Sequence, residues 1–412
     1  MTSIAFFTLD MTMNGASKAL IDILNHLDYN KVSVDVYVCS FGGELDNEFP
    51  GQVNVIPVPR YPSDPVGLIG CAAKHPIHFI RSLRQKKRLA SEKKHINCEA
   101  TSFRMPIIDK KYDAAIAFRH YNLDTMYVIN NMKAKKKYFW VHGEANLTPD
   151  EQELLGKYYK KYDGVFPVSK TAENRLCAYF PWLREKSVVL NNITDADKLK
   201  RLADEGNGFD DNCQGLRILS IGRLSPEKGF IMAAEACKIL SDKGYDFRWY
   251  IAGDGIERAK IEKYISQNGI SDKLILLGTV MNPYRMLREC DIYVSCSLSE
   301  TFSLTVMEAK TFERPILSTD IPAIRERVIA GETALLADTT PDSLAEGLAK
   351  LLDDECLRKR ISYNQSLEEH SDFSMITLFM NKISPERNNE RNTPAIGFNK
   401  QTPSRKDPRK PQ

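Results

Sequence analysis

The sequence predicts an α/β protein built from two doubly wound halves that face a cleft. Apolar segments of strand length alternate with helical patterns, and this alternation is interrupted once and then restarts. Continuous apolar strands separated by helices indicate a parallel sheet that is covered on both faces. Such sheets bind ligands beyond the carboxyl ends of their strands, so two linked halves place a cleft between these ends.

Strands and helices alternate through the first half of the chain. An apolar strand at Ser3–Leu9 is followed by a loop at Met13–Ser17 and by a helix that runs to Leu27. The further buried strands expected here are Val32–Cys39, Val53–Val58, Asp113–Phe118, Tyr138–His142 and Val165–Ser169. We expect residues 1–192 to form the N-terminal domain.

A polar segment separates the two halves. Residues 193–215 contain the cluster Glu205–Asn212, in which Asp, Asn and Gly favour loop structure. We expect this segment to be the linker between the domains.

The alternation restarts at Leu216, and residues 216–369 are expected to form a second doubly wound domain. The expected strands are Leu216–Ile221, Phe247–Ala252, Leu274–Leu277, Ile292–Cys296, Pro315–Ser318 and Ala334–Leu336. Helices are expected at 229–242, from Glu257 onward, at 341–352 and at 354–369. Residues 384–412 are rich in Pro, Asn, Arg and Lys, and we expect this basic tail to be disordered.

Composition indicates a soluble globular protein of two domains, because the chain has 412 residues of which 27% are charged. No apolar run approaches the roughly 18 residues that span a bilayer, and the N-terminus lacks the features of a secretory signal. We therefore expect a cytoplasmic protein. The nine cysteines are scattered and contain no C-x-x-C pair, which argues against a disulfide framework and a zinc site.

The net charge of +3 is concentrated at one end of the chain. Residues 384–412 hold seven of the 57 basic residues and three of the 54 acidic ones, so the rest is close to neutral. Strong attraction to nucleic acid is therefore not a property of the whole protein, and we expect no nucleic-acid partner.

Two carboxylates, Glu300 and Glu308, follow the expected strand at 291–297 and lie eight residues apart. A strand end, a loop and a helix N-terminus form a common anion site of open α/β sheets. In a continuous helix the two side chains would be about 12 Å apart along the axis, far enough to serve two ends of a long ligand. The alternative interpretation is two solvated glutamates on a surface helix.

Two cations, Arg223 and Lys228, follow the first strand of the second half. The permanently charged fork of arginine and the mobile charge of lysine suit a diphosphate. Ordinary surface charges on a strand-to-helix loop are the alternative.

An ordered set of motifs resembles the retaining, group 1 glycosyltransferases of family 4, which have the GT-B fold of two Rossmann-like domains. The set is Gly-Arg-Leu-x-x-x-Lys-Gly at 222–229, Ala-Gly-Asp-Gly at 252–255, Leu277-Gly278, Glu300-x7-Glu308-Ala309 and Pro315. The resemblance covers about residues 1–383 and is strongest over 216–337. It also implies that residues 370–383, which include Phe373-Ser-Met375, form a helix that returns to the first domain.

The resemblance implies a role for each matching residue of the second half. Arg223 and Lys228 would hold the donor diphosphate, Glu308 the ribose hydroxyls, and Glu300 would lie at the transferred sugar. The backbone amides of the loop Phe302, Ser303 and Leu304 would face the sugar and phosphate. Fixed cations and helix amides would stabilise the charge of the leaving group, so no metal and no cofactor is expected. The D-x-D spacing of Asp195 and Asp197 lies in the expected linker and is interpreted as chance.

The first half would supply the acceptor side of the cleft. Asn14-Gly15-Ala16 resembles the Gly-Gly-Ala loop of the family with Asn14 in place of the first glycine, a residue that tolerates a left-handed backbone. His142 ends an expected strand, as the active-site histidine of the family does. Ile321-Pro322 and Ala334 stand where the family usually has glycine near the donor, so the identity of the donor sugar cannot be transferred from the family.

A basic segment, Lys74–His95, contains eight Lys or Arg and one acidic residue, with apolar residues between them. A second basic cluster lies at Lys133–Lys137. A membrane-surface patch for a lipid-linked acceptor is one interpretation, which would place the protein at the inner face of the membrane. A solvated helix face is the other.

The function expected from these features is retaining transfer of a sugar from a nucleotide-diphosphate-sugar to an acceptor hydroxyl. The acceptor would be a saccharide or a lipid-linked sugar, in cell-surface polysaccharide or glycolipid assembly. The alternatives are a nucleotide-sugar epimerase of the same architecture and a non-catalytic relative that binds a membrane or a partner.

Overall fold

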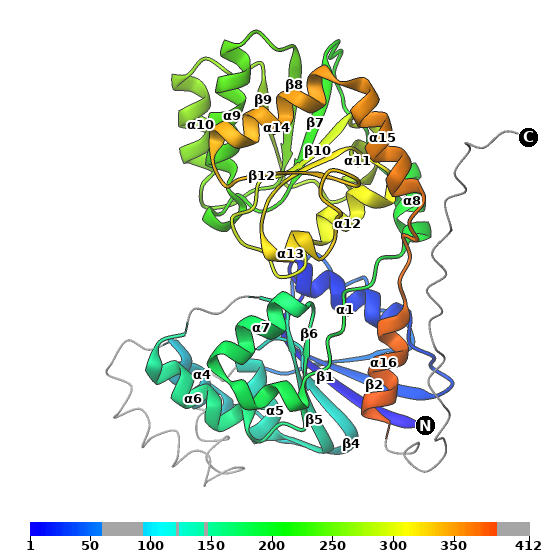
Figure 1. Cartoon of the computed structure of the whole chain (residues 1–412). Coiled ribbons are helices and arrows are strands. Elements are labelled where there is room, and N and C mark those ends of the chain that lie inside the picture. Colours follow the sequence, from blue (N-terminus) through cyan, green and yellow to red (C-terminus); the bar gives the residue numbers. More distant parts are fainter. Residues whose placement is uncertain (60–93, 121–122, 144–146, 385–412) are drawn as a thin grey trace, which may run out of the picture.

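The structure is a computed structural model of the whole chain, and it describes residues 1–59, 94–120, 123–143 and 147–384. Its elements form two lobes, each built on a six-stranded sheet (Figure 1). The expectation of an α/β protein with two doubly wound halves is therefore confirmed. The expected basic patch Lys74–His95 and the expected disordered tail lie almost entirely outside the described residues.

The first sheet has the strand order β3-β2-β1-β4-β5-β6, and its neighbouring strands are parallel. In chain order its elements are β1 (Thr2–Asp10), α1 (Gly15–Asn25), β2 (Val32–Ser40), β3 (Asn54–Pro57), α4 (Lys94–Arg104), β4 (Ile108–Ala117), α5 (Leu123–Asn131), β5 (Met132–Val141), α6 (Pro149–Tyr159), β6 (Gly164–Pro167), α7 (Lys170–Tyr179) and the 3₁₀ helix η1 (Pro181–Lys186). The centre of β1, Ile4 to Phe7, is fully buried, as its unbroken apolar sequence predicts.

The second sheet has the order β12-β11-β10-β7-β8-β9 and is also parallel. Its elements are β7 (Leu216–Ile221), the 3₁₀ helix η2 (Pro226–Lys228), α9 (Phe230–Asp242), β8 (Phe247–Ala252), α10 (Arg258–Gln267), β9 (Leu274–Gly278), α11 (Tyr284–Glu289), β10 (Ile292–Ser295), α12 (Leu304–Thr311), β11 (Ile316–Thr319), α13 (Pro322–Arg325), β12 (Leu335–Ala337), α14 (Pro341–Asp353) and α15 (Glu355–Ser366).

Both sheets therefore have the same topology. In each, the first strand lies beside the fourth, β1 beside β4 and β7 beside β10. The strand order reverses at this pair, and ligands of doubly wound sheets bind beyond the carboxyl ends of the strands at this point. The loops after β1, β4, β7 and β10 are therefore the first places to look for a site.

The segment expected to be a polar linker contains a helix, α8 (Ala196–Glu205). Leu199 and Ala203 are buried, and they pack in a core cluster with residues of α11 and α12 in the second lobe. Leu202, which is partly buried, packs against the same cluster, so three apolar side chains dock a largely polar helix. The exact domain boundaries stay a prediction.

The strands β4 and β5 are longer than the sequence predicts, because their first halves are polar. Lys133 and Lys135 at the start of β5 form ion pairs of 2.7 Å with Asp109 and Asp113 of β4. Cross-strand charge pairs replace apolar packing there, so hydrophobic patterning detects only the buried ends of these strands.

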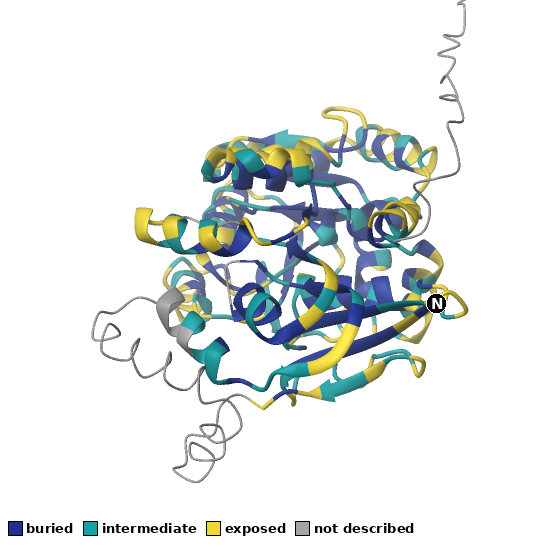
Figure 2. Cartoon of the chain, turned by 90° about the horizontal axis from the view of Figure 1, so that it is seen from below, coloured by how far each residue is buried: buried dark blue, intermediate teal, exposed yellow. Residues whose placement is uncertain are grey.

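The last described helix, α16 (Ser374–Ile383), lies against the first lobe (Figure 1). Its buried residues Met375, Phe379 and Ile383 belong to the N-terminal core cluster. Figure 2 shows the dark-blue buried strands inside the molecule and yellow exposed positions on the outer helices. None of the helices in the described ranges has both the length and the apolar character needed to cross a membrane.

Candidate active site

Lys228 and Glu300 meet at the point where the strand order of the second sheet reverses. Lys228 lies in the loop after β7 and Glu300 in the loop after β10. The Lys228 ammonium nitrogen Nζ is 2.5 Å from Glu300 Oε1, and the Ser297 hydroxyl donates to the same oxygen over 2.8 Å. The two loops that sequence analysis singled out separately therefore form one charged cluster.

Glycine at position 229 lets these two loops approach. Gly229 ends η2 with a left-handed backbone of φ 68°, which favours glycine. A Cβ atom there would lie 2.1 Å from the carbonyl oxygen of Cys296. A second link is the Leu298 amide, which donates to the Glu227 carbonyl over 2.8 Å. This packing of backbone on backbone brings the side chain of Lys228 to Glu300.

Arg223 lies in the loop after β7, ahead of Lys228, and is exposed. Among the described residues its guanidinium makes no ion pair or hydrogen bond, so its donors are available to an anion. The two cations predicted from the sequence therefore differ: Lys228 is held by Glu300, whereas Arg223 makes no such contact within the described part of the chain.

The N-terminus of α12 carries the loop Phe302, Ser303 and Leu304. Ser303 is buried and adopts a left-handed backbone with φ 63°, which is unusual for a residue other than glycine and is found often at functional sites. Its hydroxyl oxygen is buried and has no hydrogen-bond partner among the described residues. The ring of Phe302 is also buried, and the guanidinium carbon of Arg327 lies 4.0 Å from the ring centre.

Glu308 lies one helical turn beyond Leu304 in α12, and only 6% of its surface is exposed. The Tyr284 hydroxyl donates to Oε1 over 3.2 Å, and Lys18 Nζ lies 3.7 Å from the same oxygen. The other oxygen, Oε2, is buried and has no hydrogen-bond partner among the described residues. The carboxylate is therefore anchored through one oxygen and has the second available.

His142 follows β5 in the first lobe, where its ring packs against Phe118 and Trp140 with centroid distances of 4.5 and 5.9 Å. Burial, and secondarily the charge of Arg119, lower the pKa of His142 to about 3. The imidazole is therefore neutral at physiological pH. Its Nε2 atom is buried and has no hydrogen-bond partner among the described residues.

The loop after β1 contains Asn14 and Gly15, and its backbone differs from the expectation. Asn14 is extended, with φ −155°, and not left-handed. Its side chain accepts a hydrogen bond from the Ser17 amide over 3.0 Å and so caps α1. Asparagine suits this position because it is a strong N-cap residue. Gly15 is then the first residue of the helix.

The loops of the two lobes are in direct contact. A Cβ atom on Gly15 would lie 3.5 Å from the Leu304 side chain. The Thr301 hydroxyl donates to the backbone carbonyl of His142 over 2.7 Å. The structure thus brings Gly15 to the α12 N-terminus and His142 to the loop of Glu300. Glu308 lies deeper, beside Lys18.

Sequence analysis missed Lys18, Tyr284 and Arg119. Arg119 follows β4, and its Nη2 atom lies 3.1 Å from the Asp10 carboxylate at the end of β1, so it marks the reversal point of the first sheet. The topology rule could have found it once the strand order was known. Lys18 and Tyr284 carry no local signal, because their partner Glu308 is distant in sequence.

Asp195, one half of the D-x-D spacing, has a structural role. It caps α8 by accepting a hydrogen bond from the Lys198 amide over 2.9 Å, and its other oxygen lies 3.3 Å from His26 Nε2. The D-x-D motif, which the sequence places in a linker, therefore lies at the start of a helix.

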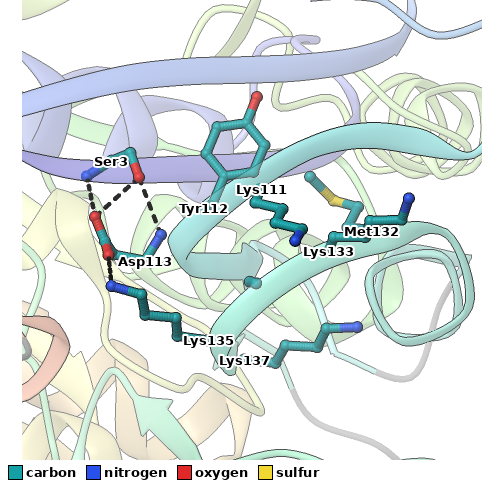
Figure 3. A pocket seen from close by; sticks show the side chains of 9 residues that line it. Ser3, Lys111, Tyr112, Asp113, Met132, Lys133, Lys135 and Lys137 are labelled. Atoms are coloured by element: carbon teal, nitrogen blue, oxygen red, sulfur yellow. Dashed lines mark hydrogen bonds and ion pairs between the residues drawn. The ribbon is translucent and has the colours of Figure 1, made fainter.

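A cavity of about 460 Å³ lies at the other end of the first sheet, near the amino ends of β1, β4 and β5 (Figure 3). Its lining includes Lys111, Lys133, Lys135 and Lys137. Lys133 and Lys135 are paired with aspartates, and neighbouring Lys136 is 2.9 Å from Asp163. The basic cluster at Lys133–Lys137 is thus largely neutralised.

Comparison with known proteins agrees with this architecture. Residues 212–367 match the family model of the glycosyl transferases group 1. The chain is 26% identical to alpha-D-kanosaminyltransferase of Streptomyces kanamyceticus, over 76% of this chain and 82% of that protein. It is 28% identical to a 4-alpha-N-acetylgalactosaminyltransferase of Campylobacter jejuni, whose substrate is a diphospho-undecaprenol-linked saccharide, over 50% of this chain and 55% of that protein.

The crystal structure of HepE from Anabaena in complex with UDP and glucose superposes with a TM-score of 0.68 at 15% identity, over 93% of this chain and 99% of that one. The fold is thus the GT-B fold, and the curated relatives named above are glycosyltransferases. The match to the model of the group 1 glycosyl transferases covers the residues that hold the second sheet. The first curated relatives are matched over 63%, 82% and 58% of their own lengths.

Proposed function

We propose that the protein transfers a sugar, with retention of anomeric configuration, from a nucleotide-diphosphate-sugar to an acceptor hydroxyl. The observation that carries this proposal is the charged cluster of Lys228 and Glu300 at the reversal point of the second sheet. Arg223, which forms no ion pair with any described residue, lies in the same loop as Lys228, and the loops of the first lobe are held against the cluster. A cation pair beside a helix N-terminus suits a diphosphate that gains charge as it leaves.

The donor would lie along α12. Arg223 and Lys228 would hold the diphosphate together with the amides of Phe302, Ser303 and Leu304. Glu308 would accept hydrogen bonds from the ribose hydroxyls through its available Oε2 atom. The pairing of Lys228 with Glu300 keeps both charges compensated until the donor arrives, when the diphosphate and the sugar hydroxyls replace that contact.

The chemistry would take place on one face of the sugar. The bond between the anomeric carbon and the phosphate oxygen breaks, the acceptor oxygen bonds to the anomeric carbon from the same side, and the acceptor proton passes to a phosphate oxygen. Glu300 and neutral His142 would position the sugar without forming a covalent intermediate. Lys228 and Arg223 would stabilise the developing charge. No metal and no cofactor is assigned a step.

The acceptor would bind mainly to the first lobe. One relative acts on a diphospho-undecaprenol-linked saccharide and another takes part in amylovoran biosynthesis. These names support a saccharide or lipid-linked acceptor in cell-surface polysaccharide or glycolipid assembly.

We further propose that contact with an anionic membrane surface, if the acceptor is lipid-linked, comes from Lys74–His95. The other basic cluster is a weaker candidate because aspartates neutralise it. Sedimentation with vesicles of anionic and of neutral phospholipid tests this. Replacement of the basic residues of 74–95 by Gln should abolish binding to the anionic vesicles, and unchanged binding would contradict the proposal.

A thermal-shift screen across UDP-, GDP-, ADP- and TDP-sugars tests the donor, because a ligand that binds only the native state raises the melting temperature. Transfer is then measured with the stabilising donor. Arg223→Ala and Glu308→Ala should lower kcat/KM by about 10²-fold or more, whereas Arg360→Ala, an exposed arginine on α15, should not.

The products separate this function from its rivals. A retained anomeric configuration in the NMR spectrum of the product supports the mechanism, and an inverted one refutes it. An altered nucleotide sugar formed from donor alone would indicate an epimerase. Binding without turnover over a broad acceptor panel would indicate a non-catalytic relative. Unchanged transfer by Arg223→Ala would remove the site assignment.

A further inference from the structure

One face of α1 docks onto the second lobe. Lys18, Asp22 and His26 are spaced by four residues, so their side chains share a face of the helix. Asp22 forms an ion pair of 2.7 Å with Lys198 of α8, and the His26 ring lies 3.3 Å from Asp195 at the start of that helix. Lys18, at the end nearest the candidate active site, reaches Tyr284 and Glu308.

Lys18, Tyr284 and Glu308 form a directional chain of hydrogen bonds. The Lys18 ammonium donates to the Tyr284 hydroxyl oxygen over 3.4 Å, and that hydroxyl donates to Glu308 Oε1 over 3.2 Å. Burial, with a smaller contribution from Glu308, raises the pKa of Tyr284 well above its usual range. Tyr284 therefore keeps its proton, so it can only donate to the carboxylate.

The second carboxylate oxygen is left without a donor. Glu308 Oε2 is buried and has no partner within the described ranges. A buried carboxylate oxygen without hydrogen bonds is unfavourable, whereas a vicinal pair of ribose hydroxyls offers donors of the required kind. Because Oε1 is held in place, the carboxylate cannot turn freely, and Oε2 is presented in one orientation.

We propose that Lys18 and Tyr284 are positioning residues that fix Glu308 for the ribose of the donor, and that Lys18 couples nucleotide binding to contact between the lobes. This inference rests on the proposed function, which places a nucleotide at Glu308. Lys18 comes from the first lobe, so its contact with Glu308 exists only when α1 is docked. Binding that requires the docked arrangement is weakened whenever the docked population falls.

The test is the discrimination between a nucleoside diphosphate and its 2′-deoxy and 3′-deoxy counterparts, measured by calorimetry with UDP, GDP and ADP. In the wild type, loss of the hydroxyl that donates to Glu308 should raise Kd about tenfold, which is the usual effect of removing a hydrogen bond to a charged group. Tyr284→Phe should reduce this ratio to about twofold. Lys18→Met should both reduce the ratio and weaken the binding of all forms several-fold, and Lys18→Arg should restore most of both.

Asp22→Asn is the matched control. It removes another ion pair between the lobes, one turn along α1, and leaves Glu308 untouched. It should weaken the ribose and deoxyribose forms by the same factor, with their ratio unchanged. Melting temperatures confirm that each variant is folded.

The outcomes separate this inference from the proposed function. If Glu308→Gln loses the discrimination while Tyr284→Phe and Lys18→Met keep the wild-type ratio, the positioning role is refuted and the proposed function stands. If the wild type binds no nucleoside diphosphate, or binds all forms equally with Glu308→Gln unchanged, the placement of the ribose is wrong and the inference falls with it.

Discussion

At the scale of single residues, the candidate active site contains buried polar atoms that lack a hydrogen-bond partner among the described residues. The described residues supply none for the Ser303 hydroxyl, for His142 Nε2 or for Glu308 Oε2. Buried polar groups are nearly always hydrogen-bonded in native proteins. These three are among fourteen such atoms in the described residues, and they lie on loops of the two lobes that face each other, where a polar ligand would satisfy them.

Ser303→Ala should leave the free energy of unfolding unchanged or raise it by about 1 kcal/mol, because it removes a buried hydroxyl that lacks a partner. The same change should weaken donor binding. Ser220→Ala is the control: its hydroxyl donates to the Val294 carbonyl over 2.6 Å and accepts from the Trp249 indole over 3.0 Å. That variant should lose about 1–3 kcal/mol. Urea denaturation measures both, and a Ser303→Ala variant as unstable as the control would show that the hydroxyl is bonded.

His142 should make the folded protein sensitive to acid. Its pKa is about 3 in the folded state and near 6.5 in an unfolded chain, so the unfolded state binds the extra proton as the pH falls below 6.5. The stabilising contribution is complete above pH 6.5 and is lost progressively toward pH 3. Between pH 7 and pH 5 the wild type should lose about 2 kcal/mol more than His142→Gln. Chemical denaturation at both pH values measures this. If the free energy of unfolding fell by the same amount in both proteins, the imidazole would not be buried in its neutral form.

At the scale of elements, a helix of the first lobe is capped by a residue of the second. The first three amides of α7 are all satisfied: Ser169 accepts from Ala172 over 2.9 Å, and the Glu326 carboxylate accepts from Lys170 over 3.0 Å and from Thr171 over 2.6 Å. Glu326 follows α13, so this carboxylate joins the two lobes through a helix N-terminus.

Replacing Glu326 by Ala should lower the free energy of unfolding by about 1–2 kcal/mol. The change leaves two helix amides without an acceptor and removes a negative charge that interacts favourably with the positive end of the helix dipole. Glu346, an exposed residue of α14, provides the control, and Glu346→Ala should change stability by less than about 0.5 kcal/mol. The comparison uses chemical denaturation at one pH and ionic strength. Equal stability of the two variants would mean that the contact contributes nothing.

At the scale of the whole molecule, α16 joins the end of the described chain to the first lobe. The Phe379 ring is fully buried and lies 5.6 Å from Trp140, 5.7 Å from Phe166 and 6.1 Å from Phe6, between ring centres. The N-terminal core is therefore completed by a residue that follows the entire second lobe in sequence.

Phe379→Ala should destabilise the first lobe by about 3–5 kcal/mol, because it opens a cavity among packed aromatic rings. The neighbouring Leu378 is 48% exposed, and Leu378→Ala should be close to neutral. Calorimetry measures both variants. A small effect of Phe379→Ala would show that α16 is not part of the core of the first lobe.

Much of the fold and part of the site could be predicted from the sequence, for local reasons. Buried parallel strands are continuous apolar runs, so β1, β2 and β7 were located within a residue or two. The polar first halves of β4 and β5 and the helix α8 were missed, because charge pairs and sparse apolar residues leave no periodic signal. The proximity of Lys228 and Glu300 could be expected, because each follows a strand of one parallel sheet.

The sequence by itself determined two doubly wound domains and the charged residues at their strand ends, since both follow from short-range patterns. Only the tertiary structure decided which atoms remain available. Lys18 and Tyr284 are 266 residues apart, and they contact Glu308 at one carboxylate oxygen while the other has no donor among the residues that the structure describes. Likewise, burial among aromatic rings makes His142 neutral, and Glu326 reaches α7 across the lobes. These properties depend on contacts between segments distant in the chain, which no local pattern encodes.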